Sequence, residues 1–552
     1  MEDRISHLPD HVLHDILSLL SRRAAAKTSI LSKHWNSVWN SFPILVFHQY
    51  HKKVKANFWD SVDRTIQLRY KNSIFTETLE IWIGRDTKVP KHLDSWIDCL
   101  VTLKLNQLIL VIWNNQTRSE DGKQYYVLPP CVWNSKWLRV LNLEGCEFSG
   151  SINTIGIVSS LRKLKLHRVR IDESTFHQVI SSCFHLEDLQ ITQCIGFNVL
   201  NVIGLEGIHT VRLLLSSDDQ SVSIEAPGLQ SLRFHGDSSS LERIIEACIL
   251  KKLKEINLVE TDIFAVEYEF DEFIPEFPCL EKLSLDRCKL KESFTVSNGR
   301  LMSFSLTECE NVKHIVLDAC CLNQFSYRGD CRLDITWIAA SEHVRISHHN
   351  RRLCWMSFDK IAMYLVNLWF CKFLTIIYDK SQWIAPEALD GLSCGIEQLR
   401  IKIAKWNGGR QIGGSCLLIV KEFLRMSRRP SSVFVELGNC KESLASFMKL
   451  DFLYQHEEID QGGQVINTNC ACGDSSCWRC CLEEVQISQS LHAMRGRDAR
   501  NLVEFFEDNA LRLKKISYVE SEDDFHSQEF ACCLASQMQI NGHPRHLVLS
   551  FP

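Results

Sequence analysis

The chain has 552 residues, of which 45% are apolar and 23% are charged, and its formal net charge is −5. This apolar content excludes a chain that stays disordered for lack of a core. The two signs of charge are mixed without the basic excess that favours nucleic acid or an anionic membrane, so we expect neither as a partner.

The start of the chain and its cysteines favour an intracellular protein. Residues 1–4 lack the basic start and apolar run of a signal peptide. The longest strongly apolar stretch, residues 108–113, is too short to cross a bilayer. The 24 cysteines are spread along a long chain, which favours reduced thiols over a disulfide framework. We therefore expect the protein in the cytoplasm, the nucleus or both.

The first fifty residues predict three short helices. Pro9 suits the start of the first helix, and residues 21–23 should interrupt it. A second helix is expected over residues 24–31, and Ser32 can cap a third that carries Trp35. The apolar residues of the first helix recur at i, i+3, i+4 and i+7, which gives one apolar face, at Leu13, Ile16, Leu17 and Leu20.

Helices of this size cannot bury so much apolar surface by themselves. The leucine-rich face and the tryptophans stay partly exposed unless a partner or the next domain covers them. A simple three-helix cap for the following domain is the alternative interpretation.

Two motifs in this segment carry a resemblance to a known family. Residues 8–17 read LPDHVLHDIL, residues 28–35 read TSILSKHW, and Trp39 follows. Over about residues 4–47 the chain resembles the F-box of plant F-box/leucine-rich-repeat proteins, although residues 21–26 (SRRAAA) replace the usual Leu-Pro pair. The resemblance implies docking onto a Skp-type adaptor of a cullin ubiquitin ligase. By position, the docking surface or the core that shapes it comprises Leu8, Pro9, Ile16, Leu17, Leu20, Leu31 and Trp35.

A leucine-rich-repeat pattern, L-x-x-L-x-L, dominates the middle of the chain. Its units follow one another at steps of 21 to 27 residues. Because residues two apart share one face of a strand, both leucines of L-x-L enter the core and their neighbours face outward. The units begin at Leu138, Leu161, Leu186, Ile208, Leu229, Leu253, Leu280, Leu301 and Leu322.

These patterns predict an α/β chain with a three-helix F-box over residues 1–50. A leucine-rich-repeat solenoid with a parallel concave sheet is expected over residues 75–395, since each repeat buries its apolar face only by stacking. Residues 396–552 are predicted to hold irregular terminal repeats. Within them, about residues 482–520 resemble an FBD-type tail and about residues 455–481 form a cysteine-rich loop.

The outward residues of the repeats suggest where a target protein binds. We name as the basic lane a group of cations expected on neighbouring strands. This lane would attract an acidic or phosphorylated segment through charge-assisted hydrogen bonds. A solvated face with chance clustering of charge is the alternative. The residues of the basic lane are Lys163, Lys165, Arg212, Arg233 and His235.

The cysteine-rich loop holds the densest set of metal-ligating residues. Cys470, Cys472, Cys477 and Cys480 are close enough in sequence to form a tetrahedral zinc site. The usual pair of C-x2-C knuckles with a longer loop between them is absent, so reduced loop thiols are the default interpretation.

No catalytic signature appears in the sequence, and we expect no cofactor and no catalysis by the chain itself. The predicted function is a substrate-recognition subunit of a cullin-type (SCF) ubiquitin ligase, with the F-box on the adaptor and the repeats on an unknown target. The first alternative is a repeat scaffold that sequesters a partner without recruiting a ligase. A weaker one is a hydrolase or small-molecule receptor that uses the concave face.

Overall fold

The computed structural model of the chain describes residue 5 and, with gaps, residues 8–519. The chain divides into unit 1, residues 1–269 and 276–279, and unit 2, residues 270–275 and 280–552. None of the described helices is long and apolar enough to span a bilayer. The gaps are residues 50–56, 85–86, 114–124, 149–158, 216–219, 237–240, 242–251, 264–273, 275–276, 330–333, 341–344, 351–355, 358–371, 379–382, 385–395, 404–419, 422, 425–426, 428, 438–445, 455–476 and 490–495.

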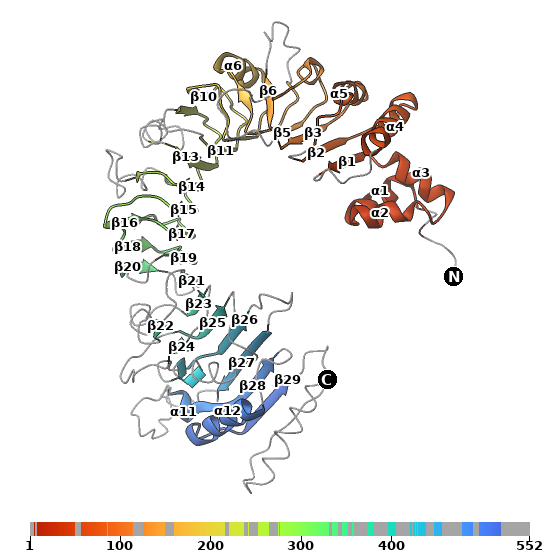
Figure 1. Cartoon of the computed structure of the whole chain (residues 1–552). Coiled ribbons are helices and arrows are strands. Elements are labelled where there is room, and N and C mark those ends of the chain that lie inside the picture. Colours follow the sequence, from red (N-terminus) through yellow and green to blue (C-terminus); the bar gives the residue numbers. More distant parts are fainter. Residues whose placement is uncertain are drawn as a thin grey trace, which may run out of the picture. The chain divides into compact units, whose positions relative to one another are not determined.

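Unit 1 begins with three helices, α1 (Asp10–Leu19), α2 (Arg22–Thr28) and α3 (Lys33–Ser41), as the sequence predicts (Figure 1). Ser32 caps α3, because its hydroxyl accepts a hydrogen bond from the backbone N–H of Trp35 at 3.1 Å.

The predicted span of the second helix is wrong. The helix starts at Arg22 and ends at Thr28, instead of running over residues 24–31. The hydroxyl of Ser21 accepts a hydrogen bond from the backbone N–H of Ala24 at 3.4 Å, and this cap brings the two arginines into the first turn. The end of the segment is therefore left as a turn before α3.

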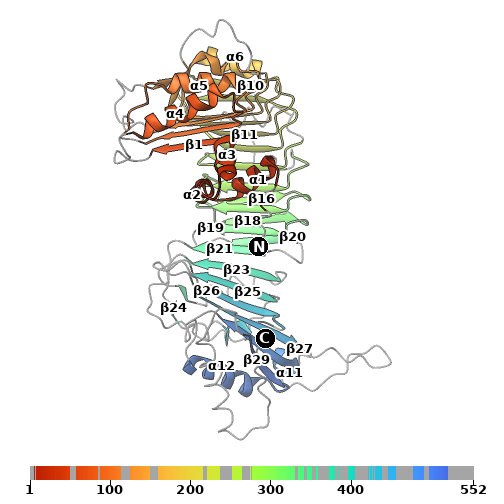
Figure 2. The same cartoon turned by 90° about the vertical axis from the view of Figure 1, so that its right-hand side faces the viewer.

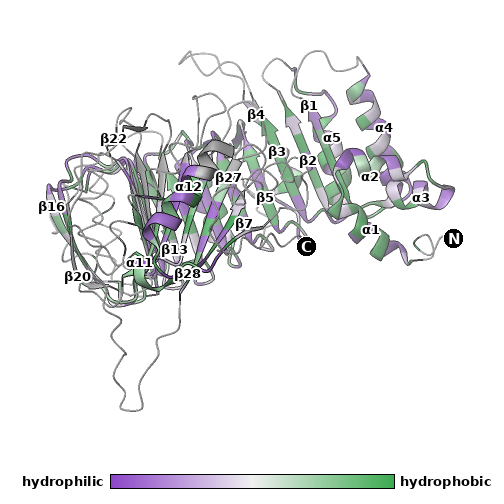
Figure 3. Ribbon diagram, turned by 90° about the horizontal axis from the view of Figure 1, so that it is seen from below, coloured by the Kyte–Doolittle hydropathy of each residue, from purple (hydrophilic) through white to green (hydrophobic). Residues whose placement is uncertain are grey.

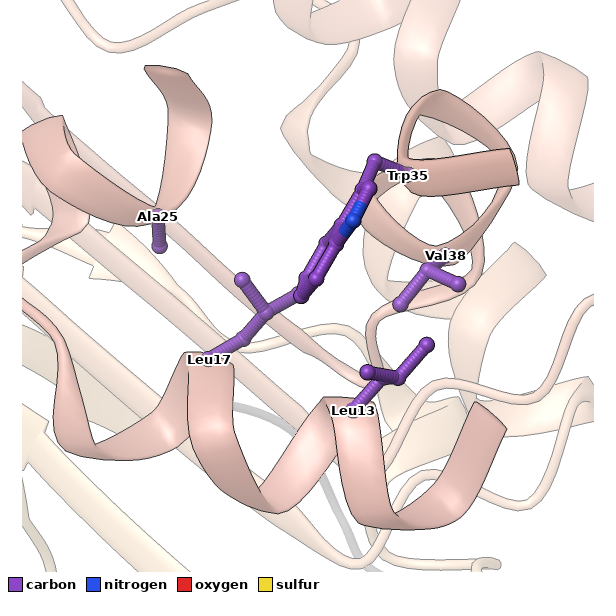
Figure 4. Packing of buried hydrophobic residues seen from close by; sticks show 5 residues of the cluster. All are labelled: Leu13, Leu17, Ala25, Trp35 and Val38. Carbon is purple, nitrogen blue, oxygen red and sulfur yellow. The ribbon is translucent and has the colours of Figure 1, made fainter. Parts of the chain in front are cut away.

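The three helices pack around a small core (Figure 4). Trp35 points from α3 toward Leu17 of α1, and it fills the centre of the group. The partly buried side chains of Leu8 and Ile16 pack against this core. Its buried members are Leu13, Leu17, Ala25, Trp35 and Val38.

The remainder of unit 1 is a stack of parallel strands, as the repeat pattern predicts. Each strand pairs with the next in register through the whole series. The strands are β1 (Ile44–Gln49), β2 (Thr78–Ile83), β3 (Gln107–Ile112), β5 (Val140–Glu144), β7 (Lys163–His167), β9 (Asp188–Thr192), β11 (Thr210–Leu214), β13 (Ser231–His235) and β14 (Glu255–Val259).

Burial along these strands alternates with period two. Leu141 and Leu143 of β5 are fully buried while Asn142 between them is partly exposed, and the later strands repeat the pattern. Figure 3 shows the hydrophobic residues that run along β2 and β3. The L-x-L leucines therefore face the interior of the solenoid, as the sequence predicts.

The return segments of unit 1 lie on the other side of this sheet (Figure 1). Three of them form helices that cover the core, and others form short strands in two small parallel sheets, β4-β6-β8 and β10-β12. The sequence pattern did not separate these strands from loops. The elements are α4 (Phe58–Lys71), α5 (Leu93–Thr102), α6 (Glu173–Ser182), β4 (Tyr126–Val127), η1 (Pro130–Val132), β6 (Cys146–Phe148), β8 (Arg170–Ile171), β10 (Val199–Ile203) and β12 (Ser221–Glu225).

Cysteines close the turns after several strands. The thiol of Cys194 donates to the backbone carbonyl of Leu166 at 3.5 Å, and that of Cys309 donates to Leu285 at the same distance. Neither cysteine forms a disulfide, and burial raises the pKa of Cys194 to about 11. These cysteines act as small apolar residues with a weak donor.

Unit 2 has the same strand architecture (Figure 2). Seven strands pair in parallel, and the return segments form a second parallel sheet, β16-β18-β20, and a short pair, β22-β24. The main strands are β15 (Lys282–Asp286), β17 (Ser303–Thr307), β19 (Gln324–Arg328), β21 (Arg345–Asn350), β23 (Phe373–Tyr378), β25 (Gln398–Ile403) and β26 (Ser432–Leu437), and the others are β16 (Ser293–Ser297), β18 (His314–Ala319), β20 (Asp334–Ala340), β22 (Met356–Ser357) and β24 (Trp383–Ile384).

The last part of unit 2 departs from the expected parallel stack. Strand β27 (Ser446–Tyr454), which the sequence did not predict, runs antiparallel to both β26 and β28 (Leu482–Gln489). Only residues 438–445 separate β26 from β27, too few for the crossover of about a dozen residues that parallel strands need.

The final described elements are a strand, a helix and a strand. Strand β28 leads to α12 (Gly496–Asn509), and β29 (Lys515–Val519) pairs in parallel with β28. The short helix α11 (Trp478–Cys481) precedes them, and its Trp478 indole donates to the carbonyl of Leu424 at 2.6 Å. The sequence also predicts a helix near Phe530 and a strand over residues 547–549, and both lie outside the described residues.

A buried arginine joins the three helices to the repeats. Arg69 of α4 is only 4% exposed, and its guanidinium donates to the backbone carbonyls of Asn40 at 2.9 Å and Phe42 at 2.7 Å. It also donates to the hydroxyl of Thr76 at 3.3 Å. Burial lowers the pKa of Arg69 to about 10, and these hydrogen bonds offset that cost by using carbonyls at the C-terminal end of α3.

A second, more exposed link lies at the start of α2. Arg22 forms an ion pair with Glu80 of β2 at 3.7 Å, and the same carboxylate lies 2.8 Å from His48 of β1. These two links consist of hydrogen bonds and an ion pair, and neither uses an apolar side chain of the three helices.

Replacing Arg69 with Met should loosen the joint between the helices and the repeats. The change keeps much of the side-chain length but removes every donor, which should cost about 2 kcal/mol and raise local opening about 30-fold. Hydrogen exchange of the amides in α3 and β1 measures this opening. Arg64→Met is the matched control, because Arg64 is exposed on the same helix. Equal exchange in the two variants would show that Arg69 does not hold the joint.

Candidate adaptor interface and solenoid face

The three-helix segment exposes large aliphatic side chains at two corners. Leu19 and Leu20, at the junction of α1 and α2, are 86% and 40% exposed. Ile30 and Leu31, in the turn between α2 and α3, are 83% and 67% exposed. We call these four residues the apolar corners. Scattered apolar residues are normal on a protein surface, but four large ones leave much apolar surface exposed on so small a segment.

Local backbone geometry explains this exposure. Leu20 is the C-cap of α1 in extended conformation, so it leaves the helical face that buries Leu13 and Leu17. The backbone N–H groups of Ile30 and Leu31 bond to the carbonyls of Lys27 and Thr28 at 3.3 and 3.0 Å, which closes a tight turn. Residues in such a turn point away from the helix core.

The predicted adaptor-binding residues fall into two groups. Leu17 and Trp35 are buried members of the core, and Leu8 and Ile16 pack against it. Pro9, Leu20 and Leu31 are exposed. The structure thus separates side chains that shape the surface from those that a partner can touch.

Sequence reasoning missed two of the apolar corners, Leu19 and Ile30. Leu19 lies off the i, i+3, i+4, i+7 face of α1, and Ile30 lies in the turn after α2, so periodicity gave no reason to select either. For Leu19, an apolar residue on the polar side of a short amphipathic helix was the available signal.

The residues of the basic lane lie on neighbouring strands of unit 1. Register pairs Lys163 with Asp188 and Lys165 with Gln190 on β7 and β9. The same register places Arg212 of β11 directly beside Arg233 of β13. The expected alignment of the outward cations is therefore present, but an acid lies among them.

Several members of the lane already have polar contacts. Arg212 forms an ion pair with Asp188 at 3.4 Å. The His235 ring lies 2.8 Å from the backbone carbonyl of Val259 and 3.7 Å from Glu260. The lane is thus less uniformly basic than its sequence suggests, and its strongest concentration of charge is at Arg212 and Arg233.

The predicted zinc site is only partly described. Cys470 and Cys472 lie outside the described residues, while Cys477 is half-buried at the start of α11 and Cys480 is buried within α11. Burial raises the pKa of Cys480, which disfavours the thiolate that a metal needs. In the part of the chain that the structure describes, no three metal-ligating side chains come together.

Comparison with known proteins matches both halves of this arrangement. Residues 5–47 match the F-box domain family, and residues 68–244 match a leucine-rich-repeat domain described as At1g61320/AtMIF1, LRR domain. The first match covers α1 to α3 and most of β1, and the second runs from the end of α4 through β13.

Relatives from Arabidopsis thaliana carry the same two features in their names. The F-box/LRR-repeat protein At3g26922 is 26% identical over 54% of this chain and 94% of its own length. The putative F-box/LRR-repeat protein At4g15060 is 29% identical over 61% of this chain and 74% of its own length. The F-box/FBD/LRR-repeat protein At5g56420 is 28% identical over 46% of this chain. The match spans about half of that protein's length, 55%.

Alanine substitutions should separate core from surface among the adaptor-binding candidates. Leu17→Ala should destabilise the three helices by about 2–5 kcal/mol, because it leaves a cavity in a small core. Leu31→Ala should change stability by no more than about 0.5 kcal/mol, because the side chain is exposed. Limited proteolysis within residues 8–41 reports the difference. Equal cleavage of the two variants would contradict this division.

Proposed function

The chain belongs to the plant F-box/leucine-rich-repeat proteins, and from this premise we propose that it docks a Skp-type adaptor through the apolar corners of its F-box and holds a target protein on its repeats. The combination of F-box and repeats supports a substrate-adaptor role in SCF-type ubiquitin ligases in general. Members of this family are in general non-catalytic adaptors. The finer proposal concerns which residues of this chain make each contact.

The observation that carries the proposal is the exposure of Leu19, Leu20, Ile30 and Leu31 on helices whose own core is already complete. Burying aliphatic side chains of this size gains about 1.5–3 kcal/mol each. The F-box cannot obtain that gain internally, because Leu13, Leu17 and Trp35 already fill its core. A partner with an apolar groove can obtain it.

The polar links between F-box and repeats also support this role. Arg69 and the Arg22–Glu80 pair attach the F-box without using the apolar corners. A fixed attachment keeps the adaptor and the target at a constant separation, so the target has a high effective concentration near the ligase. The chain contributes proximity in this scheme, and it carries out no bond-making step.

A scaffold that sequesters a partner without recruiting a ligase remains the competing function. That function needs the repeats but gives the apolar corners no role. Adaptor binding by the intact chain therefore separates the two proposals.

Replacing Leu31 with Glu should abolish adaptor capture. The substitution places a charge where an apolar groove should close over the side chain, and an unpaired buried charge costs several kcal/mol. We expect at least a tenfold loss of a co-expressed Skp-type adaptor in affinity capture of the full chain.

Leu511→Glu is the matched control, because Leu511 in unit 2 is 69% exposed against 67% for Leu31. It should capture the adaptor as the unmodified chain does. Adaptor capture that survives both Leu31→Glu and the companion change Ile30→Glu would reject the apolar corners as the docking surface.

A further inference from the structure

One row of outward side chains in unit 1 differs from every other row of that face. It lies at the centre of five successive strands, β7, β9, β11, β13 and β14, whose register aligns these positions. All five side chains carry N–H donors, and none is a carboxylate. We call this the donor row, and it consists of Lys165, Gln190, Arg212, Arg233 and Asn257.

Acids occur on both sides of the donor row, since Glu260, just past the end of β14, lies 3.7 Å from His235. The outward position two residues earlier carries Asp188 on β9 and Glu255 on β14. Asp188 pairs with Arg212, and Glu255 accepts a hydrogen bond from the Ser231 hydroxyl at 3.1 Å. These acids lie at the margin of the row, and Asp188 offsets part of the charge of Arg212, while the row itself carries three cations and no carboxylate.

Two adjacent arginines concentrate that charge. Arg212 and Arg233 lie directly opposite each other on neighbouring strands, about 4.8 Å apart along the stack. Like charges in this position destabilise a sheet. An anion held between the two guanidinium groups would convert the repulsion into two charge-assisted hydrogen bonds.

One of these two arginines has unused hydrogen-bonding capacity. Among the described residues, no acceptor meets the buried Nε of Arg233. Buried polar atoms are normally satisfied, and a group left open marks a place where a ligand atom can enter.

Unit 2 offers a contrast within the same chain. The central outward position of β15, β17 and β19 carries Ser284, Ser305 and Ser326, aligned by the same kind of register. These hydroxyls bring no charge. The donor row is thus a local feature of unit 1 and does not follow from the repeat itself.

We propose that the donor row binds an acidic segment of a target protein, with carboxylates or phosphates three residues apart in a polyproline-II conformation. Lys165 and Arg212 are two strands apart, which is about 9.6 Å. Polyproline II has three residues per turn and rises about 3.1 Å per residue, so side chains i and i+3 lie on one side about 9.3 Å apart.

The same spacing explains the remaining donors. An acid at i bonds Lys165, and an acid at i+3, about 9.3 Å away, meets Arg212 on the side next to Arg233. An acid at i+6, about 18.6 Å from the first, reaches the Asn257 amide four strands from Lys165. A fully extended strand fits less well, because its same-side residues are about 6.7 Å apart. This inference names the target class for the proposed target-binding surface and rests on that function.

Two fluorescent heptapeptides of equal composition test the spacing. The spaced peptide is Asp-Pro-Pro-Asp-Pro-Pro-Asp, and the blocked peptide is Asp-Asp-Asp-Pro-Pro-Pro-Pro. The full chain should bind the spaced peptide at least fivefold more tightly. A third peptide with phosphoserine in place of aspartate shows whether phosphate is the stronger anion. Equal binding of the spaced and blocked peptides would overturn the proposed conformation and register.

Variants of the row test its location. Replacing Lys165, Arg212 and Arg233 with Gln should weaken binding of the spaced peptide at least tenfold. The control replaces Arg64, Lys71 and Arg139 with Gln, because these exposed cations of unit 1 remove the same charge away from the row. Unchanged binding in the row variant, or an equal loss in both, would overturn the proposal, as would equally tight binding of single-stranded RNA.

Adaptor capture separates this inference from the ligase role. The row variant should still capture the Skp-type adaptor, because the apolar corners are untouched. Loss of peptide binding with adaptor capture intact supports the donor row. Intact peptide binding in a chain that captures no adaptor would instead reject the ligase role and leave the donor row standing.

Discussion

Each repeat of this chain has an apolar face that only the next strand can close. Leu141 and Leu143 of β5 are fully buried because β3 and β7 flank them in register. The period-two alternation fixes which side chains enter the core, and a slip of one residue would turn that set outward. The register of every strand therefore depends on that of its neighbour, and so does the alignment of the outward residues into rows.

The F-box faces the opposite constraint, since its three helices cannot bury all their apolar residues. Polar contacts join the F-box to the repeats, and four of its apolar side chains stay exposed. Arg69, although nearly fully buried, attaches the F-box through carbonyls that the end of α3 leaves unpaired within the helix. This polar joint leaves the apolar corners exposed.

The repeats could be predicted from periodicity, because the two leucines of each L-x-L segment are the side chains that the strand buries. The cap of α3 also followed from local chemistry, as Ser32 shows. What sequence reasoning missed depends on three-dimensional context. Strand β27 lacks the repeat pattern, and the exposure of Ile30 arises from a turn rather than a period. The pairing of Arg212 with Asp188 required the register of β9 and β11, which no single repeat contains.

Rows of outward side chains can change without altering the core, because the leucines beside them never contact that face. Each strand contributes one side chain to a row, so successive side chains of a row are about 4.8 Å apart. In unit 1 the central row consists of N–H donors over β7 to β14, and in unit 2 it consists of serines over β15 to β19. A periodic row favours a ligand with a matching period over one with merely opposite charge. Such a solenoid then selects a bound segment whose charged groups are spaced as its own strands are.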